Sequence, residues 1–456
     1  MASSYLKRTP SSAGSNTTAT VSAWCKYHGG DFNTIVGGNE GSSSTDRSLF
    51  SISSDGEIYN QIVHSNTAYE QYSNRKLLDP AAWYHIVIQF DTSNGTQADR
   101  VKTYVNNQLI TSWSTTASWP QNVPLKFWDT NNSPEFLIGA RKSSSNYQYK
   151  FNGAMAHVHV IDGTVYAPSV FAETDSTSGI WIPKTAPSVT YGTNGGFYKF
   201  ASGAIGTDSS GKSNNMTVVG NITSNKDSPD NNFITLNPLD NKYSAWSFSN
   251  CNNTVTMSNT NETYTTSTVG LSKGLWYWEV KITDKGANQT FEIGIASEPS
   301  RASGSQVWLG YHPNNYGLYA SSGNVYNGNG ASSASYGVSV DEGDIVGVYL
   351  DLDASKIYYA KNGAIMNSGT GLAITAVGST VNGFYFPAIG KQSGASDTKI
   401  FDFNFGNGYF GTTAISNPED DAGGEGAFKY NPSTGTFDGS SKNFRAICTN
   451  NIATYG

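Results

Sequence analysis

The sequence of 456 residues is short of charged residues, of long apolar runs and of basic blocks. Only 14% of the residues are charged and the net charge is −7. Because no basic segment is present that could bind a phosphate backbone, we expect no nucleic-acid partner. No apolar run approaches the ~18 residues of a membrane span, and the N-terminus has no apolar signal segment. We therefore expect synthesis in a cytoplasm and no membrane insertion.

Cysteine and helical periodicity are also scarce. The three cysteines, Cys25, Cys251 and Cys448, are odd in number and far apart, so they form neither a CxxC metal pair nor a disulfide framework. We expect them to be buried as small apolar side chains. The sequence is instead rich in Gly (48), Tyr (27), Phe (21) and Trp (10), a composition that suits short strands and tight turns.

Apolar residues alternate with polar ones along many segments, which predicts half-buried strands. In two segments, 84–90 and 276–282, every second residue is apolar. Asn106-Asn107 and Asn362-Gly363 stand between strand-like runs and predict hairpin turns. We predict an all-β protein of two antiparallel β-sandwiches joined by a Gly/Ser/Asn-rich linker. The expected domains are 1–182 and 233–412, with a linker at 183–232 and a C-terminal docking tail at 413–456.

Four segments of the first half together form one recognisable pattern. Trp83-Tyr84-His85 opens an apolar strand, the next strand ends in Tyr104-Val105-Asn106, and later strands contain Gly139 and Gly153. This pattern resembles the concanavalin A-like (laminin-G-like) lectin family over about residues 1–180. The resemblance implies a jelly-roll sandwich of a family that includes lectins, without naming the ligand.

The second half has a more specific pattern over about residues 233–412. Its blocks follow one another in the order 274–280, 293–295, 343–348, 350–353, 362–363 and 386–388. They resemble the SPRY (B30.2) family. That resemblance implies a second sandwich that binds peptides or proteins through loops at one end and that is not an enzyme.

The tandem of these two domains resembles structural proteins of tailed bacteriophages. The connector segments 171–175 and 179–183 and the ending 443–452 contribute to that resemblance. It implies a place on the outside of a virion, as a tail fibre, an appendage or a capsid decoration. Because virion proteins meet symmetry axes, a homo-oligomer, most plausibly a trimer, is expected alongside contacts with other virion proteins.

Aromatic and amide side chains in the expected loops are the candidate ligand-binding residues. Lectins stack sugar rings on Trp or Tyr and bond hydroxyl groups to Asn and Asp. In the first half the candidates are Trp113, Trp119, Trp128, Asp129, Asn131, Tyr147 and Tyr149. In the second half they are Tyr311, Tyr316 and Tyr326. Burial of these aromatics at the ends of a sandwich, or in a subunit contact, is the alternative interpretation.

Catalytic and metal sites are not expected. A glycoside hydrolase needs two carboxylates close together, and Glu57, Glu70, Glu135 and Glu173 stand apart in the sequence. His157 and His159 share one strand face, where they could bind a metal or simply make that face polar. Oxygen-rich loops could hold Ca²⁺ or only form turns. Their candidate residues lie at 91–94, 129–132, Asp99 and Asp162.

The sequence thus predicts a non-enzymatic protein of the virion surface, made in the host cytoplasm. It would adhere to host-surface glycans, or decorate and cement the particle. A polysaccharide depolymerase on the same scaffold and a bacterial surface adhesin are the alternatives. Whether the protein sits on the tail or the head remains open at this point.

Overall fold

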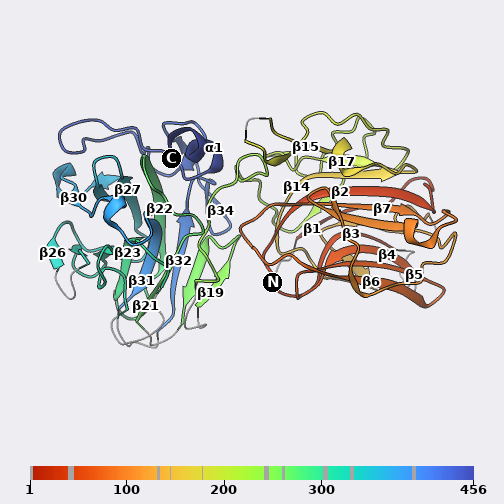
Figure 1. The fold of residues 1–456 in the computed structure, drawn as a ribbon, viewed down its shortest axis with the longest axis horizontal. Coiled ribbons are helices and arrows are strands. Elements are labelled where there is room, and N and C mark those ends of the chain that lie inside the picture. Colours follow the sequence, from red (N-terminus) through yellow and green to blue (C-terminus); the bar gives the residue numbers. More distant parts are fainter. Residues whose placement is uncertain are drawn as a thin grey trace. The chain divides into compact units, whose positions relative to one another are not determined.

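The computed structural model describes residues 4–39, 46–130, 134–143, 145–176, 178–240, 246–258, 262–300, 307–328, 333–392 and 397–456. The chain divides into two compact units, Met1–Ser224 and Asn225–Gly456. Regular structure is almost entirely β in both units, which confirms the predicted fold class. Each unit contains two large antiparallel sheets (Figure 1).

In the first unit, an eight-stranded sheet has the order β10-β6-β5-β4-β3-β11-β1-β18. Its strands are β1 (Tyr5–Arg8), β3 (Asn33–Asn39), β4 (Arg47–Ile52), β5 (Glu57–His64), β6 (Thr67–Lys76), β10 (Trp113–Thr115), β11 (Glu135–Ile138) and β18 (Thr217–Val219). The six-stranded sheet has the order β17-β14-β2-β7-β8-β9. Its strands are β2 (Thr18–Tyr27), β7 (Tyr84–Asp91), β8 (Val101–Val105), β9 (Gln108–Leu109), β14 (Gly153–Asp162) and β17 (Gly196–Tyr198).

The core of the first unit lies between these two sheets, which Figure 1 shows as stacked layers. As the alternation predicted, Ile86, Ile88 and Phe90 of β7 face this core. The turn between β8 and β9 is made by Asn106 and Asn107, both with positive φ, a conformation that Asn tolerates better than most residues. The short hairpins β12 (Arg141–Ser143) with β13 (Asn146–Gln148) and β15 (Ala172–Thr174) with β16 (Trp181–Pro183) complete the strands of this unit.

The predicted linker at 183–232 is largely part of the first unit. Its strand β17 pairs with β14, and β18 pairs with β1 at the edge of the other sheet. Met216 of the same stretch is buried in the core. The sequence pattern was weak because these strands are only three residues long, too short to show a period. The boundary between the units lies at residue 224 rather than within a free linker.

The outer face of the six-stranded sheet is covered by the segment 163–200. Phe171, Tyr191 and Phe197 pack there against Ile161 of β14. His159, 1% exposed, contacts Tyr191 through its Nδ1 atom at 2.9 Å. His159 therefore lies beneath a packed layer, while His157 is half-buried with its ring 5.9 Å from that of Phe197, so the two do not form an open polar face.

The second unit repeats the two-sheet plan. One sheet has the order β19-β20-β32-β22-β27-β28-β29, with β30 also paired to β28. Its strands are β19 (Trp246–Ser249), β20 (Thr254–Met257), β22 (Leu275–Asp284), β27 (Ile345–Asp351), β28 (Lys356–Lys361), β29 (Ala364–Ile365), β30 (Leu372–Ala373) and β32 (Lys399–Asn404). The other, β21-β31-β23-β24-β25-β26, consists of β21 (Thr263–Thr266), β23 (Phe291–Ala296), β24 (Tyr316–Tyr319), β25 (Asn324–Tyr326), β26 (Ser333–Ser335) and β31 (Phe386–Lys391).

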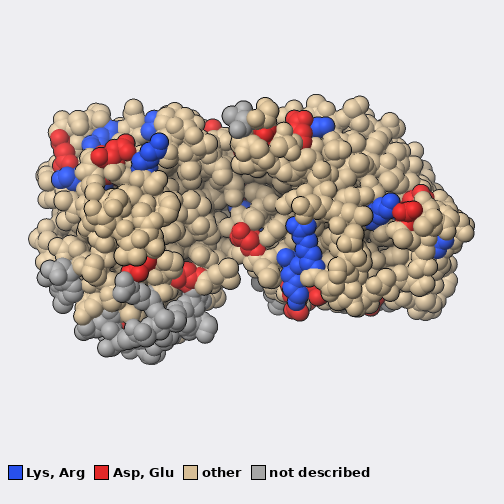
Figure 2. Space-filling view, in the orientation of Figure 1, with Lys and Arg blue, Asp and Glu red and all other residues tan. Residues whose placement is uncertain are grey.

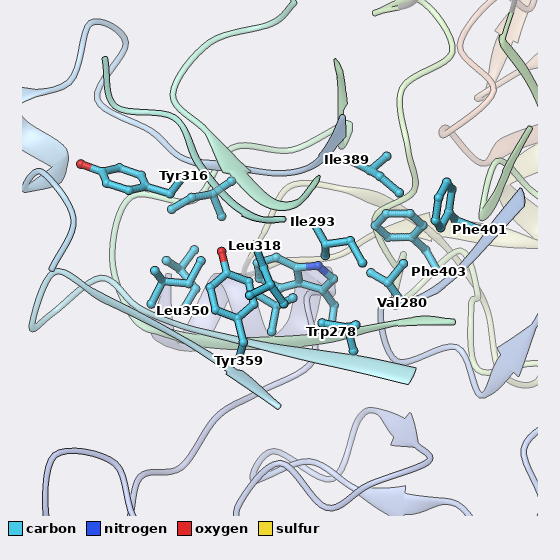
Figure 3. Packing of buried hydrophobic residues seen from close by; sticks show 14 of the residues in the cluster. Trp278, Val280, Ile293, Tyr316, Leu318, Leu350, Tyr359, Ile389, Phe401 and Phe403 are labelled. Atoms are coloured by element: carbon cyan, nitrogen blue, oxygen red, sulfur yellow. The ribbon is translucent and has the colours of Figure 1, made fainter. Parts of the chain in front are cut away.

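Large apolar side chains from both sheets fill the space between them (Figure 3). Trp278 and Val280 of β22 face Ile293 of β23 across this core, as their alternation predicted. At the predicted hairpin turn, Asn362 and Gly363 both have positive φ. The Asn362 side chain also accepts a hydrogen bond from the backbone N–H of Ile345 at 2.8 Å, which fixes the turn against β27.

The C-terminal segment 413–456 packs against the second unit itself. Its phenylalanines, among them Phe437 and Phe444, cover the tyrosines on the outer face of β22, β27 and β28. Its first strand, β34 (Thr413–Ala414), pairs with β33 (Tyr409–Phe410) just before the segment. The hairpin β35 (Glu419–Asp420) with β36 (Ala427–Phe428) follows, and the segment ends in α1 (Thr449–Tyr455). The expected docking thus takes place within the chain.

The three cysteines are free thiols. Cys25 and Cys448 are buried and Cys251 is half-buried. Burial raises the pKa of the Cys448 thiol to about 11, so it is protonated at neutral pH. Within the described part of the chain, no helix is long and apolar enough to cross a membrane.

Candidate ligand-binding face

Polar and aromatic side chains gather on the outer face of the eight-stranded sheet of the first unit. Along β5, Ile58 and Ile62 point into the core. Because successive side chains of a strand point to opposite faces, Tyr59 and Gln61 point outward. Their cross-strand partners on β6 are Tyr72 and Glu70, which share the outer face. The same alternation places Arg47 of β4 beside them.

The aromatic rings on this face form a connected group. Phe32, just before β3, stacks on Tyr149 with ring centroids 4.9 Å apart and meets the edge of Tyr59 at 5.2 Å. Tyr59 in turn contacts Tyr72 at 4.5 Å. The guanidinium carbon of Arg141 lies 3.9 Å from the centre of the Tyr149 ring, a cation–π contact. Tyr59 is buried as the floor of the group, and the others are half-buried.

Hydrogen bonds connect the polar members of this face. Glu70 accepts hydrogen bonds from the Tyr59 hydroxyl at 2.8 Å and from the Gln61 amide at 2.9 Å. The Gln61 carbonyl oxygen accepts one from Nε of Arg47 at 2.8 Å. We call the eight residues the outer-face cluster: Phe32, Arg47, Tyr59, Gln61, Glu70, Tyr72, Arg141 and Tyr149.

The hairpin β12–β13 brings Arg141 and Tyr149 over the sheet. Its backbone approaches β3 closely at Gly37, where a Cβ atom would lie 2.9 Å from the carbonyl oxygen of Ala140. Thr34 of β3 donates its N–H to the carbonyl oxygen of Tyr149 at 2.8 Å. The absence of a side chain at Gly37 therefore allows the hairpin to lie on this face.

Beside the cluster, Glu135 of β11 is surrounded by cations. Lys7 and Lys142 lie 3.2 and 3.0 Å from its carboxylate oxygens, and Tyr147 donates a hydrogen bond at 2.9 Å. Burial disfavours the ionised form, but the bonds from Lys142 and Tyr147 outweigh it and lower the pKa of Glu135. This carboxylate stays ionised at neutral pH, so it cannot serve there as a proton donor.

The ten predicted ligand-binding residues fall into different environments. Trp119, Trp128 and Tyr316 are 3%, 3% and 5% exposed and belong to the two cores, so the prediction is wrong for them. Trp113 is partly buried against the first core. Asp129 is held by Lys126, whose Nζ lies 2.9 Å from its carboxylate.

The remaining predicted residues stay accessible or undescribed. Tyr149 belongs to the outer-face cluster and Tyr147 to the neighbouring Glu135 group. Tyr311 and Tyr326 are half-buried and both contact Trp308 in the second unit, at 5.1 and 4.5 Å. Asn131 lies outside the described residues.

The sequence prediction missed most of the outer-face cluster. The sequence did contain a signal for this cluster. Polar and aromatic residues occupy alternate positions in the two neighbouring strands, at 57–63 and 68–74. The predicted ligand-binding residues lie in expected loops, whereas the cluster is built mainly on strands. Phe32 and Arg141 had no local signal, since only the hairpin brings them together.

The predicted Ca²⁺ ligands already have protein partners. Asp99 pairs with Lys102 at 2.7 Å, and Asp91 accepts a hydrogen bond from Ser93 at 2.7 Å. Asp162 accepts one from the Ser15 backbone N–H at 2.7 Å. Among the described residues, no three His, Cys, Asp or Glu side chains are placed to hold a metal ion.

Two family models match this chain. The concanavalin A-like lectin/glucanases superfamily (Laminin_G_3) matches residues 2–171, and the SPRY domain matches residues 275–408. These matches confirm both predicted domains, one in each compact unit.

Several curated relatives match between a quarter and a third of this chain. They include the Ran-binding proteins 9/10 homolog of Drosophila melanogaster (27% identity over 135 residues), SPRY domain-containing protein 3 of Homo sapiens (27% over 135) and Ran-binding protein 9 of Xenopus tropicalis (27% over 137). The matches cover 30%, 28% and 30% of this chain, and 12%, 28% and 22% of those proteins. This chain thus corresponds to a small part of each relative.

Solved structures similar to this chain include a human SPRY domain and a heptameric SAP-like pentraxin from Limulus polyphemus. The SPRY domain shares 21% identity, covers 35% of this chain and 94% of its own, and has a TM-score of 0.27. The pentraxin shares 12% identity, covers 41% of this chain and 88% of its own, and has a TM-score of 0.28.

Proposed function

We propose that the chain is a non-enzymatic adhesion protein that binds glycans through the outer-face cluster. The observation that carries this proposal is the gathering of half-buried aromatic rings and two guanidinium groups around the buried Gln61 amide and Tyr59 ring on one sheet face. Aromatic faces with a few fixed polar groups are typical of small-ligand sites. A sugar ring could lie on Tyr72, beside the Tyr149 and Phe32 rings, while its hydroxyl groups bond to Glu70 or Arg47.

The chemistry of the cluster favours binding over hydrolysis. Glycosidases use a carboxylic acid and a second carboxylate on opposite sides of the scissile bond. The outer-face cluster contains one carboxylate, Glu70, and the neighbouring Glu135 is ionised and tied to two lysines. We therefore assign no catalytic step to this face.

The second unit is proposed to contact protein. Its accessible aromatic group consists of Tyr311 and Tyr326 around Trp308. The SPRY match supports a protein-binding role, since the family resemblance implies that kind of ligand. On the face shown in Figure 2, the charged residues of the second unit, at the left, form small groups, several of which contain both signs.

We further propose that the protein sits on the outer surface of a tailed phage particle. The sequence resemblance of the domain tandem to phage structural proteins supports this location. Tryptic peptides of the chain should appear in purified virions, and gold-labelled antibody should mark the particle exterior. Absence from purified particles would reject the location while leaving the glycan-binding proposal intact.

Glycan binding is tested by screening the full chain on a glycan array and measuring affinities for the positive probes. Tyr149→Ala should weaken binding by at least about fivefold, because it removes a stacking ring at the ligand face. Tyr311→Ala, which removes a half-buried tyrosine of the second unit, is the matched control and should leave the affinity unchanged. The proposal fails if no glycan binds. New reducing ends in the bound polysaccharide would reveal a depolymerase instead.

A further inference from the structure

We propose that the outer-face cluster selects acidic glycans, whose sugar carboxylate is bound by Arg141. This inference rests on the proposed glycan binding and names the ligand class of the same site. It starts from the charge of the face, which differs in sign from the charge of the whole protein. The chain carries −7 overall, whereas the outer-face cluster itself contains two guanidinium groups, Arg47 and Arg141, and one carboxylate, Glu70.

Arg141 is the central cation. Its guanidinium lies 3.9 Å from the centre of the Tyr149 ring, and one of its terminal nitrogens donates to the Gln148 side chain at 2.9 Å. Its Nε atom is buried without an acceptor, and no carboxylate of the described residues lies within ion-pair distance. Because a guanidinium keeps its charge at any physiological pH, Arg141 presents an uncompensated positive charge.

Arg47 adds a second cation. Burial is the main cause that lowers the pKa of Arg47, and repulsion from nearby Arg141 lowers this pKa further. Nε of Arg47 donates a hydrogen bond to the Gln61 carbonyl oxygen at 2.8 Å, so Arg47 would lose this bond if its side chain moved away from Arg141. A carboxylate placed at the two guanidinium groups would relieve this repulsion.

The nearby carboxylates do not cancel these charges. Glu70 is held by Tyr59 and Gln61, and Glu135 is already surrounded by Lys7 and Lys142. Arg141 has no carboxylate partner among the described residues and is therefore the cation that can bind an added carboxylate. Across the strands, Glu135 pairs with Asn39 and Asn39 pairs with Arg47, so Glu135 and Arg47 lie in one cross-strand row.

The geometry favours a carboxylate on a sugar ring. A guanidinium binds a planar carboxylate with two parallel hydrogen bonds, which a single ammonium cannot reproduce. Because Arg141 is stacked on Tyr149, a carboxylate bound to its edge would bring the attached ring next to Phe32 and Tyr72. A uronic acid has both parts, an anionic planar group and a ring with an apolar C–H face.

The test uses the full chain and pairs of polymers that differ only in charge. Polygalacturonate, alginate and hyaluronan are each compared with their carboxyl-reduced forms in 0.15 M salt, with dextran sulfate as a sulfated probe. We expect at least one acidic polymer to bind about tenfold more tightly than its reduced form. Equal affinity for both forms overturns the acidic-glycan inference and leaves glycan binding standing. Binding that follows sulfate without carboxylate also overturns it.

Substitutions of Arg141 test whether this residue causes the preference for acidic polymers. Arg141→Gln should abolish the difference between the acidic and the reduced polymer, because it removes the positive charge and keeps a polar side chain. Arg141→Lys keeps the charge without the planar fork and should retain part of the preference. Arg75→Gln, an exposed arginine of β6, is the matched control. An unchanged preference in Arg141→Gln, with the fold intact by circular dichroism, refutes the assignment.

Discussion

Acidification from pH 7.5 to 5.0 should destabilise the first unit selectively, because two of its histidines are buried in the neutral form. Burial, together with nearby Lys26, lowers the pKa of His28 to about 3. Burial, together with nearby His157, lowers the pKa of His85 to about 3 as well. The ordinary value for histidine is about 6.5.

The hydrogen bonds of His85 explain why it resists protonation. The indole Nε1 of Trp181 lies 3.0 Å from Nδ1 of His85, and an indole nitrogen can only donate. Nδ1 must therefore accept, which leaves Nε2 to donate to the Ser22 hydroxyl at 2.8 Å. A proton on Nδ1 would set two donors against each other and break the contact that fixes Trp181 of β16 to the sheet.

The magnitude follows from proton linkage. Above pH 6.5 both histidines are neutral in the folded and unfolded chain, so their contribution to stability is fully present. As the pH falls from 6.5 towards 3, only the unfolded chain takes up protons, and stability is lost. At pH 5.0 the loss is about 2 kcal/mol per histidine, hence about 4 kcal/mol for His28 and His85 together. Glu135, whose pKa is lowered, loses its contribution only below about pH 4.5.

The second unit provides an internal reference. It contains a single histidine, His312. Burial raises the pKa of Glu279 to about 7, so its folded form takes up a proton between pH 7 and 5 while its unfolded form does not. This carboxyl group therefore adds stability as the pH falls through that range. The two units should respond to acid with different signs.

Peroxide oxidation of buried methionines during urea titration separates the two units. Met216 reports on the first core and Met257 on the second. We expect the urea midpoint for Met216 to fall by more than about 1 M between pH 7.5 and 5.0, while that for Met257 does not fall. His85→Gln should reduce the shift, because it removes one of the buried histidines of the first unit. Equal midpoints for Met216 at the two pH values, or parallel losses in both units, would refute the reasoning.

Three further predictions concern packing. Glu279→Ala should cost the second unit about 2–4 kcal/mol, read from the Met257 midpoint, because it leaves the donors of Lys429 and Tyr430 without their acceptor. Gly37→Val should displace the β12–β13 hairpin and weaken glycan binding about as much as Tyr149→Ala, and unchanged affinity would contradict the proposed role of the close approach. Phe444→Ala should cost about 3–5 kcal/mol and expose the C-terminal segment to trypsin; an unchanged cleavage pattern would argue against this docking.

The sequence by itself determined the fold class and much of each core. Alternation in β7 and β22 specifies one buried face, because a strand has only two faces and a slip of one residue would expose every apolar side chain. The Asn106-Asn107 and Asn362-Gly363 turns could be predicted for a similar reason, since few residues tolerate positive φ. These features depend on neighbours in the chain, which a sequence displays directly.

Only the tertiary structure decided which aromatic residues are accessible. Trp119 and Trp128 stand in loop-like sequence but enter the core, while Tyr149 remains on the surface with Phe32 and Arg141. Local pattern cannot distinguish these cases, because burial depends on what the rest of the chain places over a residue. The outer-face cluster exists because two distant segments meet over one sheet, and that proximity is a property of the folded chain alone.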